Sequence, residues 1–124
     1  MNKVDRTREG VLIIDDERDV CFLLCTFLRS NGYRADYCTS LADCMKLVKS
    51  RAHDIILLDI NLKDGNGLSL LQEHEIADDV RVIVMSAHEN KENRAKALGA
   101  DAFIPKPFSI KQVIDEIDTL RKAG

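Results

Sequence analysis

The sequence predicts a doubly wound α/β fold, in which helices cover both faces of one parallel sheet. Two observations carry this prediction. Short, wholly apolar runs at residues 11–14 and 55–58 show no polar alternation, which is typical of parallel strands buried on both faces. Segments with apolar residues at helical spacing separate such runs, so strands and helices alternate along the chain.

Five strands are expected from these patterns. In chain order, they are residues 11–14, 33–37, 54–58, 80–85 and 101–104. The second strand alternates between polar and apolar residues, as an edge strand with one wetter face does. The others are nearly uninterrupted in apolar residues, which indicates burial on both faces.

Five helices are expected between and after these strands. They are residues 16–30, a helix beginning at 40, a helix beginning near 67, residues 89–98 and a helix beginning at 109. Asn31-Gly32 gives the first helix a left-handed stop, and Gly99 ends the fourth. Ser109 and Gln112 form a capping box for the last helix, whose apolar residues recur on one face.

Size and composition indicate one ordinary globular domain. The chain has 124 residues, is 45% hydrophobic and 31% charged, and carries a net charge of -3. We expect a flexible polar tail at residues 1–10 and a single domain at residues 11–121. The charge indicates no nucleic-acid footprint, no apolar stretch approaches a membrane span, and the start lacks a signal peptide. A cytoplasmic protein is therefore expected.

The four cysteines are predicted to be free thiols rather than metal ligands or disulfide partners. Cys21 and Cys25 share one helix face, whereas Cys38 and Cys44 belong to different elements. No C-x-x-C pair is present to begin a zinc site. Free cysteine usually behaves as a small buried hydrophobic residue, and this interpretation is preferred.

Polar side chains follow the apolar runs. Asp15 and Asp16 follow the first run, Asp59 the third, Ser86 the fourth and Lys106 the fifth. Each alone has a simpler explanation, because Asp and Ser cap helices and a loop lysine is ordinary. Parallel strands, however, bring their carboxyl ends to one edge of the sheet. Two carboxylates about 4 Å apart repel by roughly 4 kcal/mol at an effective dielectric constant of 20, so their convergence predicts a site for a divalent cation and a phosphoryl group.

These residues and their neighbours resemble the receiver domain of two-component response regulators. The motifs are Ile14-Asp15-Asp16, Leu58-Asp59, Ser86-Ala87 and Ile104-Pro105-Lys106-Pro107-Phe108. Each motif is weak by itself, but their order and their places at strand ends are specific, and the similarity extends over residues 11–120. The resemblance makes the domain at 11–121 a receiver domain. It implies a flavodoxin-like five-stranded sheet in the order 2-1-3-4-5 with five helices, and strands 1 and 3 then flank the switch point where ligands bind.

The resemblance implies a magnesium or manganese site built from oxygen ligands. Asp16 and Asp59 would bind the ion directly, Asp15 through a water molecule, and Asn61 through its carbonyl. A hard cation of this kind prefers oxygen ligands and keeps several waters.

The resemblance also makes Asp59 the phosphoacceptor, which would form an acyl phosphate with a phosphoryl group from a histidine. Lys106 would neutralise one oxygen of that group, and the Ser86 hydroxyl with the Ala87 amide would bind another. Before phosphorylation, Lys106 would pair with Asp59. The Lys106-Pro107 bond is the expected cis peptide.

Three further positions are expected to tune or transmit the signal. Asn61 and His88 flank the path of an attacking water and would set the lifetime of the acyl phosphate. Phe103 occupies the place of an aromatic switch residue, where tyrosine is more familiar, and it lacks the hydroxyl. His53 and His74 share no ligand spacing and are interpreted as surface or helix-end residues.

The resulting prediction is a signalling switch whose only catalysis is its own phosphorylation and dephosphorylation. A sensor histidine kinase or a histidine phosphotransfer protein would dock on the first helix and donate the phosphoryl group. The face formed by the fourth helix, fifth strand and fifth helix would signal to a downstream protein or to an output domain outside this chain. The sequence leaves open whether phosphorylation causes the chain to dimerise. No direct contact with nucleic acid or with a membrane is expected.

Two alternatives also stay open. One is a degenerate receiver that binds partners without phosphorylation, and the intact set of acids, hydroxyl and lysine argues against it. The other is a small enzyme with an aspartyl-phosphate intermediate. It is disfavoured because the candidate nucleophile follows the third strand and the length leaves no room for a cap domain.

Overall fold

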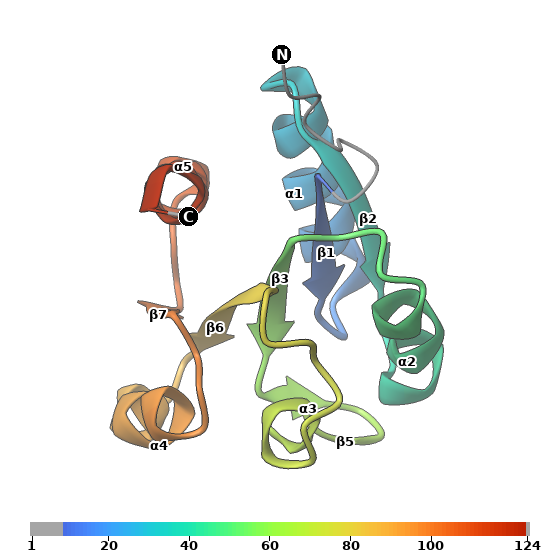
Figure 1. The fold of residues 1–124 in the computed structure, drawn as a ribbon. Helices are drawn as coiled ribbons and strands as arrows, with labels where there is room; N and C mark the ends of the chain where they lie inside the picture. The colour runs from blue at the N-terminus through green and yellow to red at the C-terminus, as the bar shows by residue number, and fades with distance from the viewer. Residues whose placement is uncertain (1–8, 124) are drawn as a thin grey trace.

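The computed structural model describes residues 9–123 and contains a five-stranded sheet in the order β2-β1-β3-β6-β7 (Figure 1). Its strands are β1 (Gly10–Ile14), β2 (Arg34–Cys38), β3 (Ile55–Asp59), β6 (Arg81–Ser86) and β7 (Ala102–Pro105). All neighbouring strands in this sheet are parallel. The predicted order, 2-1-3-4-5 when these five strands are counted along the chain, is therefore confirmed together with the doubly wound α/β fold.

Helices cover both faces of the sheet (Figure 1). They are α1 (Arg18–Ser30), α2 (Leu41–Lys49), α3 (Ser69–Gln72), α4 (Glu92–Ala97) and α5 (Ile110–Ala123). α1 and α5 share an apolar cluster on one face, and α2, α3 and α4 share a second cluster on the other. Within the described part of the chain, no helix is both long enough and apolar enough to cross a membrane.

The inner strands contribute to both apolar clusters, as their uninterrupted apolar runs predict. In β1, Val11 and Ile13 pack on the side of α1 and α5, whereas Leu12 and Ile14 pack on the side of α2, α3 and α4. Every residue of β1 and β3 is buried, while the edge strand β2 begins at an exposed residue. The side chains at the carboxyl ends of β1 and β3 are therefore held by close-packed, buried backbone.

The segment between β3 and β6 is more compact than predicted. A two-stranded ribbon of β4 (Asn61–Leu62) and β5 (Gly65–Asn66) leads into α3, which has only four residues. The backbone N–H of Gly67 donates to the carbonyl of Ile60 at 2.7 Å. A Cβ atom at Gly67 would collide with the carbonyl oxygen of Asp59, so glycine is needed where this turn approaches the end of β3. The fourth helix is also divided, because a 3₁₀ turn, η2 (Glu89–Lys91), precedes α4.

The prediction that all four cysteines are free is wrong for one pair. Cys38, at the end of β2, and Cys44, in α2, form a disulfide with Cα atoms 5.5 Å apart. The two residues belong to different elements, but α2 packs back against β2 directly after a short turn, which brings them together. Cys21 and Cys25 are free and buried, as predicted.

The ends of the folded domain differ slightly from the predicted boundaries. β1 begins at Gly10, inside the predicted tail, and residues 1–8 of that tail lie outside the described residues. α5 continues to Ala123, beyond the predicted boundary at 121.

His53 is only 4% exposed, so its interpretation as a surface residue is wrong, because the loop before β3 turns the ring inward. His74 is exposed just after α3, as expected.

Candidate functional site

Four of the predicted side chains come from the carboxyl end of the parallel sheet. Asp15 follows β1, Asp59 ends β3, Ser86 ends β6, and Lys106 follows β7. Because β1, β3, β6 and β7 are consecutive neighbours, residues far apart in sequence reach one rim. Asp15, Asp59 and Ser86 are all buried, which is unusual for polar side chains and requires partners.

The ammonium group of Lys106 lies between two carboxylates. Its Nζ atom is 3.0 Å from Oδ2 of Asp15 and 3.4 Å from Oδ2 of Asp59. The predicted pair of Lys106 with Asp59 is present, and Asp15 is the nearer partner of the two. The other oxygen of Asp15 accepts a hydrogen bond from the backbone N–H of Glu17 at 2.9 Å. Asp15 has no exposed surface, so these two contacts are what make its burial tolerable.

Burial and neighbouring charge shift the proton affinity of Asp59 and Lys106. Burial raises the pKa of Asp59 and the charge of Asp15 raises it further, while Lys106 and the backbone N–H of Asn61 offset this only in part. Burial alone would lower the pKa of Lys106, but the hydrogen bond and charge of Asp15, with the charge of Asp59, outweigh it and raise that pKa. Lys106 is thus firmly cationic, and ionised Asp59 still lacks full compensation for its charge.

Ser86 is fixed by the residues that follow β6 and β7. Its hydroxyl oxygen accepts a hydrogen bond from the backbone N–H of His88 at 2.9 Å. Its carbonyl oxygen accepts one from the backbone N–H of Lys106 at 2.8 Å. A hydroxyl that accepts one bond can still donate its own hydrogen, so Ser86 keeps the capacity to bind an anionic oxygen. Ala87 is exposed beside it.

Three consecutive acids form a group that could hold a metal ion. One oxygen atom from each of Asp15, Asp16 and Glu17 lies within 4.8 Å of the other two. Carboxylate oxygens suit a hard cation such as Mg²⁺. Glu17 is not among the predicted ligands, although it is the third acid in the run after β1. The predicted ligand Asp59 is not part of this group, and the Asn61 backbone N–H donates to Oδ1 of Asp59 at 3.3 Å.

The other predicted residues differ in their exposure. Asn61 and His88 are exposed, each two positions after a buried polar residue at a strand end. Phe103, in β7, is half-buried and packs against the cluster shared with α4. The Lys106-Pro107 peptide is cis, as predicted.

A doubly wound sheet with acids, a hydroxyl and a lysine at its carboxyl rim defines a receiver-type signalling module. The response regulator receiver domain family matches residues 11–118, so the chain belongs to this family. Receiver domains partner with histidine kinases or phosphotransfer proteins, and phosphorylation and Mg²⁺ binding are typical of them.

Individual relatives are similar to this chain over most of its length. The regulatory protein VanRB of Enterococcus faecalis is 27% identical over 117 residues, which cover 92% of this chain and 53% of the relative. The KDP operon transcriptional regulatory protein KdpE of Escherichia coli is 33% identical over 106 residues, covering 84% and 47%. The chain thus spans about half the length of these curated relatives.

A solved structure supports the fold. A two-component response regulator from Clostridium difficile superposes with a TM-score of 0.85 at 23% identity, covering 93% of this chain and 97% of that one. At this level of identity the similarity shows the fold alone.

Proposed function

We propose that this chain is a phosphorylation-controlled switch that accepts a phosphoryl group on Asp59. The observation that supports this most is the Lys106 ammonium held between Asp59 and Asp15. In the proposed step, an oxygen of Asp59 attacks phosphorus and the bond from phosphorus to the imidazole nitrogen of a donor histidine breaks, leaving an acyl phosphate. Attack by water on that acyl phosphate then releases inorganic phosphate and regenerates Asp59.

A magnesium or manganese ion fits the oxygen donors at this rim. Asp15 and Asp16, whose oxygens already lie close together, would hold the ion with Asp59 and the carbonyl of Asn61. The ion would supply positive charge against the phosphoryl oxygens. Because Lys106 provides one positive charge among several carboxylates, the excess negative charge of the rim favours a divalent cation.

The protein's own groups would receive the other phosphoryl oxygens. Lys106, already 3.4 Å from an Asp59 oxygen, would neutralise one of them. The Ser86 hydroxyl would donate to another while still accepting from the His88 amide, and the backbone amide of the exposed residue Ala87 would add a second donor. Asn61 and His88, both exposed at the edge of the rim, would control how water reaches the acyl phosphate.

The phosphoryl donor would be a sensor histidine kinase or a histidine phosphotransfer protein docked on α1. This helix carries an apolar surface that the core does not use, since Phe22, Leu23 and Phe27 are 66%, 49% and 43% exposed. Exposed apolar groups of this size commonly mark protein–protein contacts. α1 begins three residues after Asp15, so a partner on this helix would reach the rim.

The output would leave through the face formed by α4, β7 and α5. Movement of Ser86 toward a phosphoryl oxygen would change the packing of Phe103, which lies half-buried in β7 against the α4 side. Phe103 has no hydroxyl, so packing alone would distinguish its two positions. The receiver of this signal would be a downstream protein or an output domain outside these residues.

Intact-mass measurement after incubation with acetyl phosphate tests the proposed function. The native chain should gain one phosphoryl group in the presence of Mg²⁺ and none in the presence of EDTA. Asp59→Asn should abolish the gain, whereas Asp115→Asn, the same change at an exposed position on α5, should leave it intact. A folded native chain that gains no mass from acetyl phosphate or from a phosphorylated histidine donor would overturn the proposal in favour of a phosphorylation-independent binding module.

A further inference from the structure

A pocket distinct from the rim opens toward the amino ends of β3 and β6. Its volume is about 290 Å³, and it lies between the end of α2, the strands β1 and β3, and the segment that precedes β6. Its residues include Leu12, Val48, His53, Ile56, Ile76 and Val80. A cavity of about 150 Å³ accommodates benzene, so this pocket is large enough for a substituted aromatic ring.

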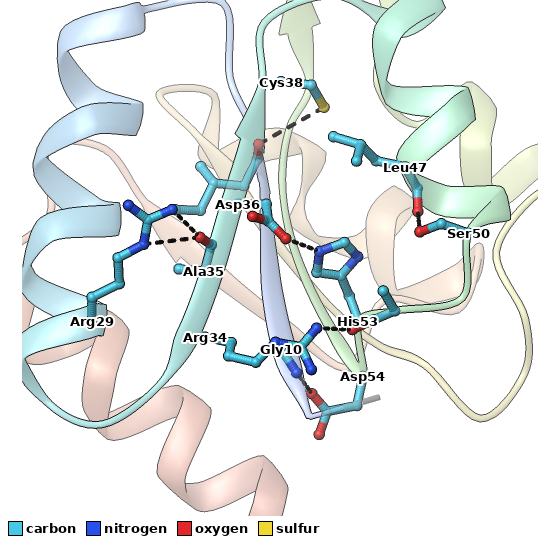
Figure 2. Close-up of polar contacts among 12 residues, drawn as sticks. Gly10, Arg29, Arg34, Ala35, Asp36, Cys38, Leu47, Ser50, His53 and Asp54 are labelled. Atoms are coloured by element: carbon cyan, nitrogen blue, oxygen red, sulfur yellow. Dashed lines mark hydrogen bonds and ion pairs between the residues drawn. The ribbon is translucent and has the colours of Figure 1, made fainter. Parts of the chain in front are cut away.

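His53 is the buried polar group in the wall of this pocket. Its ring is 4% exposed, and its Nε2 atom lies 2.7 Å from Oδ2 of Asp36 (Figure 2). An ionised carboxylate can only accept a hydrogen bond, so Nε2 carries the proton in this pair. In the neutral ring Nδ1 is then an acceptor, and it lies on the edge of the ring away from Asp36 (Figure 2).

The Nδ1 atom of His53 is buried and finds no hydrogen-bond partner among residues 9–123. Buried acceptors without a partner are rare in folded proteins, because the lost hydration is not replaced. Leu12, Val48 and Ile56, which line the pocket together with His53, have hydrocarbon side chains that cannot donate to it. A donor from a bound molecule would complete the hydrogen bonding of the ring.

The charges at the mouth of the pocket do not select an ion. Lys49 and Arg51 are balanced by Glu75 and by Asp79, whose Oδ1 atom lies 3.5 Å from the Arg51 guanidinium. The exposed His74 also lies at this mouth. Because the lining carries charges of both signs beside apolar side chains such as Leu12 and Ile56, it favours an uncharged molecule over a carboxylate or a phosphate.

We infer that this pocket binds a small, uncharged aromatic molecule whose single hydroxyl donates a hydrogen bond to Nδ1 of His53. The aromatic ring would lie against Leu12, Val48 and Ile56, and the hydroxyl would face the imidazole. Neither Asp59 nor Lys106 lines the pocket, so the inference goes beyond the proposed phosphoryl function and does not depend on it.

Phenol and anisole test the inference, because they have the same ring and differ in the hydroxyl hydrogen. Methyl resonances of Leu12, Val48 and Ile56 in the full chain should shift saturably with phenol. Phenol should bind at least about tenfold more tightly than anisole, as expected when a buried acceptor is left unpaired. Equal affinity for the two compounds, or no saturable shift with phenol, would overturn the inference.

Three variants separate the acceptor from the space around it. His53→Phe keeps a ring but removes the acceptor, so the preference for phenol over anisole should disappear. His74→Asn changes the exposed histidine at the mouth and should keep that preference, since Asn tolerates its positive φ of 56°. Val48→Phe should fill the pocket and abolish phenol binding while the His53 ring resonances stay in place, and this measurement stands even if His53→Phe does not fold. Retained phenol binding in folded Val48→Phe, or shifts centred on Lys106, would contradict the proposed site.

Discussion

Replacing Lys106 with methionine removes the ammonium group that lies between the two buried carboxylates of the rim. Methionine keeps most of the side-chain length and its apolar stem, so the change acts mainly on charge. We expect Lys106→Met to fold and to be clearly less stable than the native chain in the absence of divalent ions. Of the two side-chain contacts of the fully buried Asp15 with Lys106 and Glu17, the one from the Glu17 amide then remains within residues 9–123.

The magnitude follows from the two short ion pairs. At 3.0 and 3.4 Å and an effective dielectric constant of 20, each attraction is about 5 kcal/mol. Most of this gross attraction is offset by the desolvation of the charges, and removing one partner of a buried pair typically costs about 3–5 kcal/mol. Since the Lys106 side chain is 20% exposed, the lower end applies, about 3 kcal/mol or roughly 10 °C in Tm for a domain of this size.

Thermal and urea unfolding at pH 7.5 in EDTA measure this loss directly. Lys111→Met is the matched control, because Lys111 forms an exposed pair with Asp115 on α5 and should lose less than about 1 kcal/mol. Added Mg²⁺ should stabilise Lys106→Met more than the native chain, since the ion meets carboxylates that no ammonium neutralises. The destabilisation should shrink as the pH falls, because Asp59, whose pKa burial raises, takes up a proton and loses its charge. A Lys106→Met protein as stable as the Lys111→Met control would refute this electrostatic account of the rim.

Three further predictions concern single side chains. The exposed Asp64 accepts a hydrogen bond from the backbone N–H of Leu41, at the start of α2, at 2.9 Å, and this bond lowers its pKa. The ionised Asp64 carboxylate stabilises the folded state at pH values above the ordinary aspartate pKa of about 4, and this stabilisation is lost as the pH falls through the lowered pKa. The urea midpoints of the native and Asp64→Ala chains should therefore converge in acid. Burial, followed by the charge of Asp15, raises the pKa of Cys21 to about 12. Its thiol should therefore resist iodoacetamide at pH 8.5 in the native protein and react in urea, and fast native alkylation would show that this part of α1 opens. His88→Ala and Asn61→Ala should each change the decay rate of the acyl phosphate, measured by the loss of the added mass, and unchanged rates in both would remove these residues from control of the attacking water.

The central strands β1 and β3 could be predicted because every residue in them is buried. Residues 11–14 and 55–58 have no polar member, and the structure shows why, since β1 and β3 have apolar neighbours on both faces. The residues gathered at the carboxyl rim were predictable for the same reason, because parallel strands fix which ends meet. α3 was less predictable, since its apolar residues also serve a tight turn in which Gly67 must approach the Asp59 carbonyl.

Features that depend on distances across the fold were out of reach of the sequence. The Cys38–Cys44 disulfide requires the return angle of α2 on β2, and residue spacing does not report that angle. Lys106 lies nearer to Asp15 than to Asp59 because its Nζ atom is 3.0 Å from one carboxylate and 3.4 Å from the other, and the sequence does not report such small differences. Glu17 carried a signal, as the third acid in a row, but the ligand set taken from the family resemblance did not include it.

Asp15 and His53 are both buried polar side chains, but they differ in how many of their polar atoms have hydrogen-bond partners. Asp15 is fully buried, yet one oxygen meets the Lys106 ammonium and the other meets the Glu17 amide. His53 is buried to nearly the same degree, but within residues 9–123 only its Nε2 atom has a hydrogen-bond partner. An unpaired buried group lowers the free energy of unfolding, because its lost hydration is not replaced. A ligand that completes the hydrogen bond would restore that stability by binding the folded state. An ionised Asp59 would therefore be stabilised by a cation, and Nδ1 of a neutral His53 ring by a hydrogen-bond donor. Each site is tested with the ligand that supplies the missing group.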